Sequence, residues 1–186
     1  EAIDKTAYPD MDGFFADLAR VYREELAGLA DAGCKYVQFD DTNLAYLCDP
    51  NMREATRALG EDPDELPAAY AALINDAISG RPDDMAVCVH MCRGNAQSQW
   101  FASGGYEAIA EQVFTLTKVD GFFLEYEPRD EILRRIEEAS KYVALDQLCL
   151  SPQCGFSSNA IGNLISVEQQ IAKLRNIVEI ADEVWG

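Results

Sequence analysis

Helical segments and strand-like segments alternate along this chain of 186 residues, and the alternation restricts the folds that it can adopt. Helical periodicity runs through residues 12–33, 64–78, 105–116, 129–143 and 167–185. Short apolar runs of strand character occupy residues 35–41, 85–92, 120–127 and 146–152. Strands that alternate with helices of this length are typical of right-handed βα units and a parallel sheet. We therefore expect an α/β fold in a single domain, residues 1–186.

Two local signals mark the ends of helices. Gly33 is the last residue of the first helical segment, and glycine commonly ends a helix. Ser166 stands three positions before Gln169, which is the signature of a capping box at the start of the last helix. These signals predict where the first helix stops and where the last one begins.

The two faces of the predicted strands differ in chemistry, because successive strand residues point to opposite sides. One set is apolar and is expected to face the helices: Val37, Phe39, Val87, Val89, Met91, Phe122, Leu124, Leu148 and Leu150. The opposite set is more polar toward the carboxyl ends of the strands: Gln38, Asp40, Cys88, His90, Cys92, Phe123, Glu125, Cys149 and Ser151. Barrel and open α/β enzymes place their chemistry at this edge.

Composition excludes several classes of partner. The chain carries 33 acidic and 15 basic residues, a formal charge of −18, which repels phosphate backbones and anionic lipid surfaces. No apolar run has the length of a membrane span, and no signal peptide is recognisable at the start. The six cysteines are expected to be reduced, because a chain of this size builds its own core. We therefore expect a cytoplasmic protein that binds neither nucleic acid nor membrane.

The only histidine of the chain, His90, lies two residues before Cys92 on the same strand face. Taken singly, such a histidine is more often a hydrogen-bonded core residue, and such a cysteine a small buried hydrophobe. Glu125 ends the next strand on the same face, and Cys154 lies in the loop after the following strand. Together the four offer the donors of a tetrahedral zinc site. Because they come from three successive strand ends, and not from a C-x-x-C pair, they indicate a catalytic site.

Four motifs carry a resemblance to a known family. "HMCRGN", "FFLEYE", "LSPQCGF" and "VQFDD" resemble the zinc-site and strand-end motifs of cobalamin-independent methionine synthase and, more closely, of its shorter single-barrel homologues. The resemblance extends over essentially the whole chain. It implies a TIM barrel, a (β/α)8 fold, in which Zn²⁺ activates the thiol of homocysteine for methyl transfer in methionine biosynthesis.

The resemblance also assigns residues. It implies four zinc ligands, His90, Cys92, Glu125 and Cys154, and a substrate role for Asp40 at the amino group of homocysteine, with Gln38 beside it. Glu127 shares the parity of Glu125, but the motif match favours Glu125. The methyl donor is expected to be methyltetrahydrofolate or a methylated corrinoid, and the general acid is not identified. Assembly into a homo-oligomer is left open.

The sequence departs from the family pattern in two ways. A complete barrel needs about 250 residues, whereas only four βα units are counted here, so we expect the C-terminal half of the barrel. The link from Glu125 to Cys154 is also shorter than in relatives, which carry an additional strand there. These departures predict either a fragment or a chain that joins segments which are not contiguous in the gene product.

Other activities remain open from the sequence. The resemblance extends to epoxide-opening thiol transferases, which would use the same metal-bound thiolate. A zinc hydrolase or deaminase would activate water, but the base deaminases carry H-x-E and P-C-x-x-C where this chain has H-x-C and a lone cysteine. A structural zinc site or a purely binding domain is disfavoured, because the inward-facing Asp40 has no evident role in a core.

Overall fold

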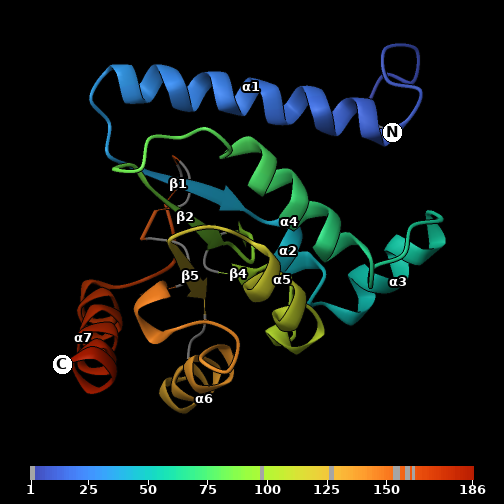
Figure 1. Ribbon diagram of the computed structural model, residues 1–186. Coiled ribbons are helices and arrows are strands. Elements are labelled where there is room, and N and C mark those ends of the chain that lie inside the picture. The colour runs from blue at the N-terminus through green and yellow to red at the C-terminus, as the bar shows by residue number, and fades with distance from the viewer. Residues whose placement is uncertain (1–2, 97–98, 126–127, 153–155, 158–159, 161) are drawn as a thin grey trace.

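The computed structural model describes residues 3–96, 99–125, 128–152, 156–157, 160 and 162–186. Four strands form one parallel sheet in the order β1-β2-β5-β6: β1 (Tyr36–Asp41), β2 (Ala86–Met91), β5 (Gly121–Glu125) and β6 (Leu148–Ser151). A separate antiparallel pair follows β2 and consists of β3 (Asn95–Ala96) and β4 (Gln99–Trp100). The parallel α/β sheet predicted from the alternation is confirmed (Figure 1).

Helices precede, connect and follow the strands of the sheet. They are α1 (Met11–Asp31), α2 (Asn43–Tyr46), α3 (Pro50–Ala58), α4 (Leu66–Ala77), η1 (Tyr106–Ala108), α5 (Ala110–Leu116), α6 (Arg129–Ala139), η2 (Leu145–Gln147) and α7 (Val167–Trp185). The predicted capping box is present at the start of α7. Gly33 has a φ of 89° just beyond α1, the left-handed conformation that glycine accepts easily. The local signals for both helix ends are therefore confirmed.

The main core lies on one face of the sheet, beneath the helices. Val87, Val89 and Phe122 are almost fully buried, and the Phe122 ring meets Phe114 of α5 edge-on with centroids 4.9 Å apart. Tyr22 of α1 contacts Phe39 of β1 in the same geometry. Burying one such aromatic side chain stabilises the fold by roughly 1.5–3 kcal/mol. The predicted apolar face is therefore the one that packs against the helices.

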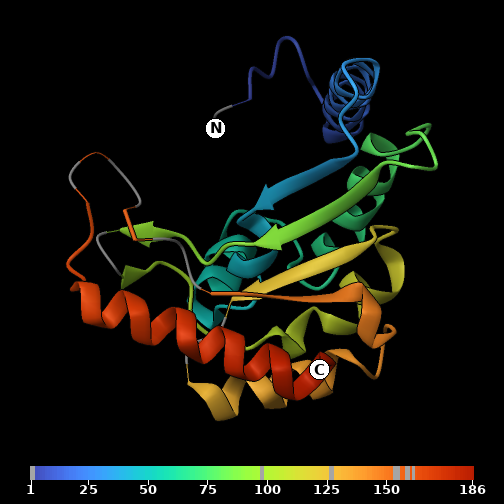
Figure 2. The same ribbon diagram turned by 90° about the vertical axis from the view of Figure 1, so that its left-hand side faces the viewer.

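The opposite face of the sheet carries the polar side chains. Along β1 the burial alternates, with Tyr36, Gln38 and Asp40 exposed and their neighbours partly buried. Figure 2 shows the carboxyl ends of the strands gathered on one side of the molecule, where the β3–β4 pair also lies. This arrangement brings the polar strand ends together at one edge of the sheet.

Two further sequence expectations can be compared with the structure. Among the described residues, Cys34, Cys48, Cys88, Cys92 and Cys149 are not in disulfides, and Cys154 lies outside them, so the reduced state of all six stays a prediction. Within the described residues, no helix is both long enough and apolar enough to cross a membrane.

Candidate metal centre

The register of the parallel strands places Asp40 beside His90. These two residues are Cα partners in the β1–β2 ladder, and the His90 Nδ1 atom lies 2.7 Å from Asp40 Oδ1. On its other side, His90 Nε2 lies 3.1 Å from Glu125 Oε1 at the end of β5. The imidazole ring is therefore held between carboxylates from the two neighbouring strands.

Cys92 completes a compact group of donor atoms. One donor atom each from Asp40, His90 and Cys92 lie within 4.8 Å of one another. Cys92 is buried, and its sulfur accepts a hydrogen bond from the backbone N–H of Gly94 at 3.4 Å. Carboxylate oxygen, imidazole nitrogen and thiolate sulfur are the three kinds of ligand that zinc takes in proteins. The donor set is thus chemically suited to a zinc ion.

Glu125 is the most deeply buried acidic group of the site. Its side chain is 1% exposed, and its Oε2 accepts a hydrogen bond from the backbone N–H of Arg93 at 2.9 Å. A buried carboxylate is costly unless each oxygen has a partner. Here Oε1 meets His90 and Oε2 meets the backbone, so both oxygens are engaged and the carboxylate has a defined orientation.

The two carboxylates also alter the proton affinity of the histidine. The hydrogen bond to Glu125 raises the pKa of His90, although burial of the ring acts in the opposite direction, and the charge of Asp40 adds to the increase. The protonated ring, which can donate one N–H to each carboxylate, is therefore favoured when no metal competes for the ring nitrogens. A metal ion would have to displace one of these protons.

The remaining predicted site residues have different positions. Gln38 lies two residues before Asp40 on the exposed face of β1, where its Oε1 accepts a hydrogen bond from the Tyr36 hydroxyl at 3.2 Å. Cys154 and Glu127 lie outside the described residues. The structure thus brings His90, Cys92, Glu125 and Asp40 together and leaves Gln38 at the periphery.

Sequence reasoning missed Tyr106, which is 3% exposed and contacts the site from η1. Its hydroxyl accepts a hydrogen bond from the backbone N–H of Glu125 at 3.3 Å and donates one to the Met91 carbonyl at 3.4 Å. No strand parity or motif identifies a residue that reaches a site from a connecting helix. The only signal that the sequence offers for Tyr106 is its aromatic character within "SGGYEA".

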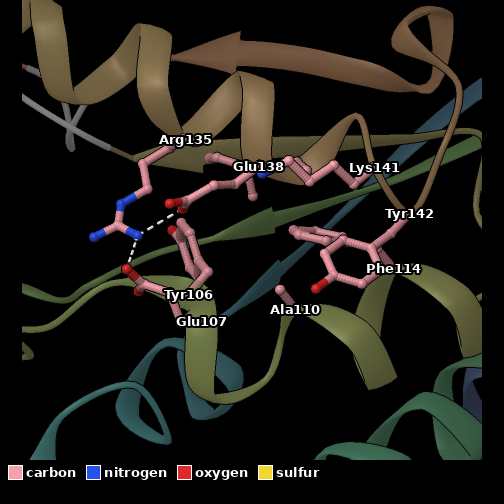
Figure 3. A pocket seen from close by; sticks show the side chains of 10 residues that line it. Tyr106, Glu107, Ala110, Phe114, Arg135, Glu138, Lys141 and Tyr142 are labelled. Carbon is pink, nitrogen blue, oxygen red and sulfur yellow. Dashed lines mark hydrogen bonds and ion pairs between the residues drawn. The ribbon is translucent and has the colours of Figure 1, made fainter.

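A separate cavity of about 210 Å³ lies on the helix side of the sheet, between α5 and α6. Figure 3 shows Arg135 between Glu107 and Glu138 at one end of this cavity, with Lys141 and Tyr142 toward the other. The carboxylates around Arg135 balance its charge. His90, Cys92 and Asp40 do not line this cavity, so it is distinct from the metal centre.

Comparison with known proteins relates the chain to one group of enzymes. No protein family model matches it. YxjH of Bacillus subtilis, a protein of unassigned function, is 43% identical over 218 residues that include 100% of this chain and 58% of that protein. The 5-methyltetrahydropteroyltriglutamate–homocysteine methyltransferase of Bacillus licheniformis is 26% identical over 91% of this chain and 23% of its own length.

A solved structure agrees with this relationship. A Listeria monocytogenes protein, provisionally named as a vitamin-B12-independent methionine synthase, superposes with a TM-score of 0.65 and 36% identity, covering 97% of this chain and 58% of that one. The chain thus spans little more than half the length of this relative and of YxjH. The YxjH alignment is longer than the 186 residues of the chain, so YxjH has additional residues within the matched span.

Proposed function

Because this chain belongs to the cobalamin-independent methionine synthase family, we propose that it forms the metal and thiol side of a zinc-dependent methyltransferase that converts homocysteine to methionine. The observation that carries the proposal is that one donor atom each of Asp40, His90 and Cys92 lie within 4.8 Å of one another at the carboxyl edge of the sheet. The buried Glu125 lies next to this group. Parallel α/β folds place their reaction chemistry at this edge.

The residues present fit a zinc ion. We propose His90, Cys92, Glu125 and Cys154 as its ligands. A histidine that binds zinc through one ring nitrogen normally donates the other N–H to a carboxylate, and the His90 ring already has a carboxylate at each nitrogen. When bound, zinc would lower the pKa of a thiol substrate so that the thiolate is present near neutral pH.

The residues of the chain would bind and orient the thiol substrate. The Asp40 side chain is 67% exposed beside the metal ligands, so its outer oxygen can accept a hydrogen bond from the ammonium group of homocysteine. Gln38 lies one exposed position earlier on the same strand and can contact the amino-acid end of the same molecule. Holding the thiol at a fixed distance from the metal ligands supplies orientation, which is a large part of the rate of a group transfer.

We further propose that the sheet is the C-terminal half of a (β/α)8 barrel. The four parallel βα units and the superposition on 58% of the Listeria protein support this assignment. The methyl donor would bind to the remainder of such a barrel. Methyltetrahydrofolate and a methylated corrinoid are both compatible with the site, and an epoxide is the alternative alkyl donor for the same thiolate.

The proposal is tested by metal analysis of purified protein. We expect about one zinc per chain, and we expect the double substitution Cys92→Ser, Cys154→Ser to remove it. The matched control is Cys34→Ser, Cys149→Ser, which removes two thiols that do not belong to the donor group. Circular dichroism establishes that each variant is folded. Retention of zinc by the folded Cys92, Cys154 variant would refute the proposed ligand set.

A further inference from the structure

We propose that Tyr106 and Arg93 are positioning residues of the metal centre, which hold Glu125 and the turn after Cys92 in the orientation that a metal requires. The inference rests on the proposed function, since it concerns the affinity of the same site for zinc. Neither side chain is a ligand. Both act through backbone groups next to the ligands.

Tyr106 joins the ends of β2 and β5, two of the three strands that carry the site. Its hydroxyl contacts the Glu125 N–H at 3.3 Å and the Met91 carbonyl at 3.4 Å, and these two groups belong to β5 and β2 respectively. Met91 lies between His90 and Cys92 in the sequence. One buried hydroxyl therefore links the backbone of β2, between His90 and Cys92, to the backbone of β5 at Glu125.

Arg93 connects the Tyr106 ring to the Glu125 carboxylate. Its guanidinium carbon lies 5.4 Å from the centroid of the Tyr106 ring, and its Nη2 donates a hydrogen bond to the Gly104 carbonyl at 2.5 Å. The residue is 8% exposed. Its backbone N–H donates to Glu125 Oε2 at 2.9 Å. Anchoring the side chain thus fixes the position of the N–H that orients the carboxylate.

The next residue, Gly94, extends the same arrangement to the cysteine. Its N–H donates to Cys92 Sγ, and its φ of 75° lies in the left-handed region. A Cβ at this position would lie 2.9 Å from the Phe101 Cβ, closer than real contacts. Two consecutive N–H groups therefore point at two different site residues, Glu125 and Cys92. The Arg93 side chain ties this turn to the loop at Gly104, in addition to the backbone hydrogen bonds that the Arg93 carbonyl accepts from Phe101 and Ala102.

Outer contacts of this kind orient metal ligands, and their loss typically weakens metal binding by about 10- to 100-fold. Tyr106→Phe keeps the ring beneath Arg93 but removes the hydroxyl. Arg93→Met keeps most of the aliphatic stem but removes the guanidinium. Each change leaves every proposed ligand in place, so a lower zinc affinity would report the orientation of the ligands and not their number.

The experiment measures zinc affinity by competition with a chromophoric chelator, and the absorption spectrum of the cobalt(II)-loaded protein. We expect Tyr106→Phe and Arg93→Met each to bind zinc about 10- to 100-fold more weakly, with shifted thiolate-to-cobalt bands. The control variants Tyr142→Phe and Arg134→Met alter exposed side chains of the same chemistry and should match the unaltered chain.

The outcomes separate this inference from the proposed function. Zinc affinity and cobalt spectra that are unchanged in both variants would overturn the positioning role and leave the proposed function standing. The positioning role is also overturned if urea unfolding of the metal-free variants shows a loss of stability while the cobalt spectrum stays the same, because the role would then be structural. Failure of the unaltered chain to bind zinc would overturn both.

Discussion

His90 has a carboxylate at each ring nitrogen, and this geometry indicates different roles for Asp40 and Glu125. Only one ring nitrogen can bind a given metal ion, so the other must donate its proton to one of the carboxylates. Glu125 is 1% exposed and Asp40 is 67% exposed. We expect the buried Glu125 to bind the metal and the exposed Asp40 to bind the substrate.

The residue-scale prediction is that Asp40→Asn keeps zinc but weakens homocysteine binding. The amide oxygen of asparagine can still accept a hydrogen bond from His90 Nδ1, whereas its charge no longer attracts an ammonium group. Isothermal titration calorimetry should show a loss of about 1.5–3 kcal/mol for homocysteine, the usual range for a hydrogen bond to a charged group. An alkyl thiol without an amino group should bind both proteins alike.

Two results would count against the role of Asp40. Loss of zinc from Asp40→Asn would make Asp40 a metal ligand. Equal losses for homocysteine and for the alkyl thiol would make its role structural.

Strand parity predicted much of the centre at this scale. It placed Asp40, His90 and Glu125 on one face, and the structure has all three in direct contact through the His90 ring. The contact between Asp40 and His90 could not be predicted, because it depends on the register between β1 and β2 and not on parity within either strand. The contact of Arg93 with Glu125 was not predictable either, because it is made by the backbone N–H of Arg93 and not by its side chain.

At the scale of elements, Asp49 fastens α3 to the loop that precedes η1. Its Oδ1 caps α3 by accepting hydrogen bonds from the N–H groups of Asn51 and Met52, and its Oδ2 accepts from the N–H and hydroxyl of Ser103. Gly104 comes next, and a Cβ there would overlap the Cys48 carbonyl oxygen. This loop also supplies the carbonyl that Arg93 contacts, so the hydrogen bonds of Asp49 support the metal centre.

The element-scale prediction is an acid-sensitive contribution from Asp49. Burial alone would raise the pKa of Asp49, but the hydrogen bonds from Ser103 and from α3 outweigh it and lower the pKa below the ordinary value of 3.8. A carboxyl whose pKa is lowered by folding stabilises the fold when the pH lies above its pKa in the unfolded chain. This contribution is lost as the pH falls through its pKa in the folded protein. Asp49→Ala should therefore lower the free energy of unfolding by about 1–2 kcal/mol near neutral pH.

Urea unfolding at neutral pH and at about pH 3 checks this prediction. The difference between the unaltered chain and Asp49→Ala should shrink at the lower pH. Asp10→Ala is the control, because Asp10 caps α1 through one N–H and is exposed, so its loss should be smaller. A difference that is independent of pH would show that the Asp49 carboxylate charge contributes nothing.

The elements themselves were predictable where the hydrophobic pattern is long. The strands and the longer helices follow from it, whereas α2, α3 and the β3–β4 pair were not expected. α3 begins with the pair Asp49 and Pro50, a cap followed by proline at its first position, which is a recognisable start signal. The signal was missed because α3 is short and mostly polar, and none of its residues is fully buried.

For the whole molecule, the formal charge of −18 is the dominant electrostatic feature. Repulsion among like charges destabilises the compact state and is screened by salt. Ion pairs such as those of Arg134 with Glu131 and Glu138 are exposed and are individually weak. Urea unfolding should therefore show higher stability at about 150 mM than at about 10 mM sodium chloride. A decrease with salt would mean that the ion pairs outweigh the net charge.

The architecture was the part that sequence predicted best, since four strands with intervening helices allow few parallel arrangements. The order β1-β2-β5-β6 follows the chain, as expected of successive βα units. Among the described strands, β1 and β6 lie at the two edges of the sheet and do not pair with each other. The barrel therefore stays a proposal, supported by the match to part of a longer relative.

X-ray absorption at the zinc edge, before and after addition of homocysteine, tests most directly whether the metal binds the thiol of the substrate. We predict that the zinc-loaded protein gains one sulfur neighbour when homocysteine is added, and that a thioether such as methionine produces no such gain. A saturating concentration of homocysteine that leaves the number of sulfur neighbours unchanged would contradict thiol activation by the metal, because a structural or water-activating zinc would behave in that way.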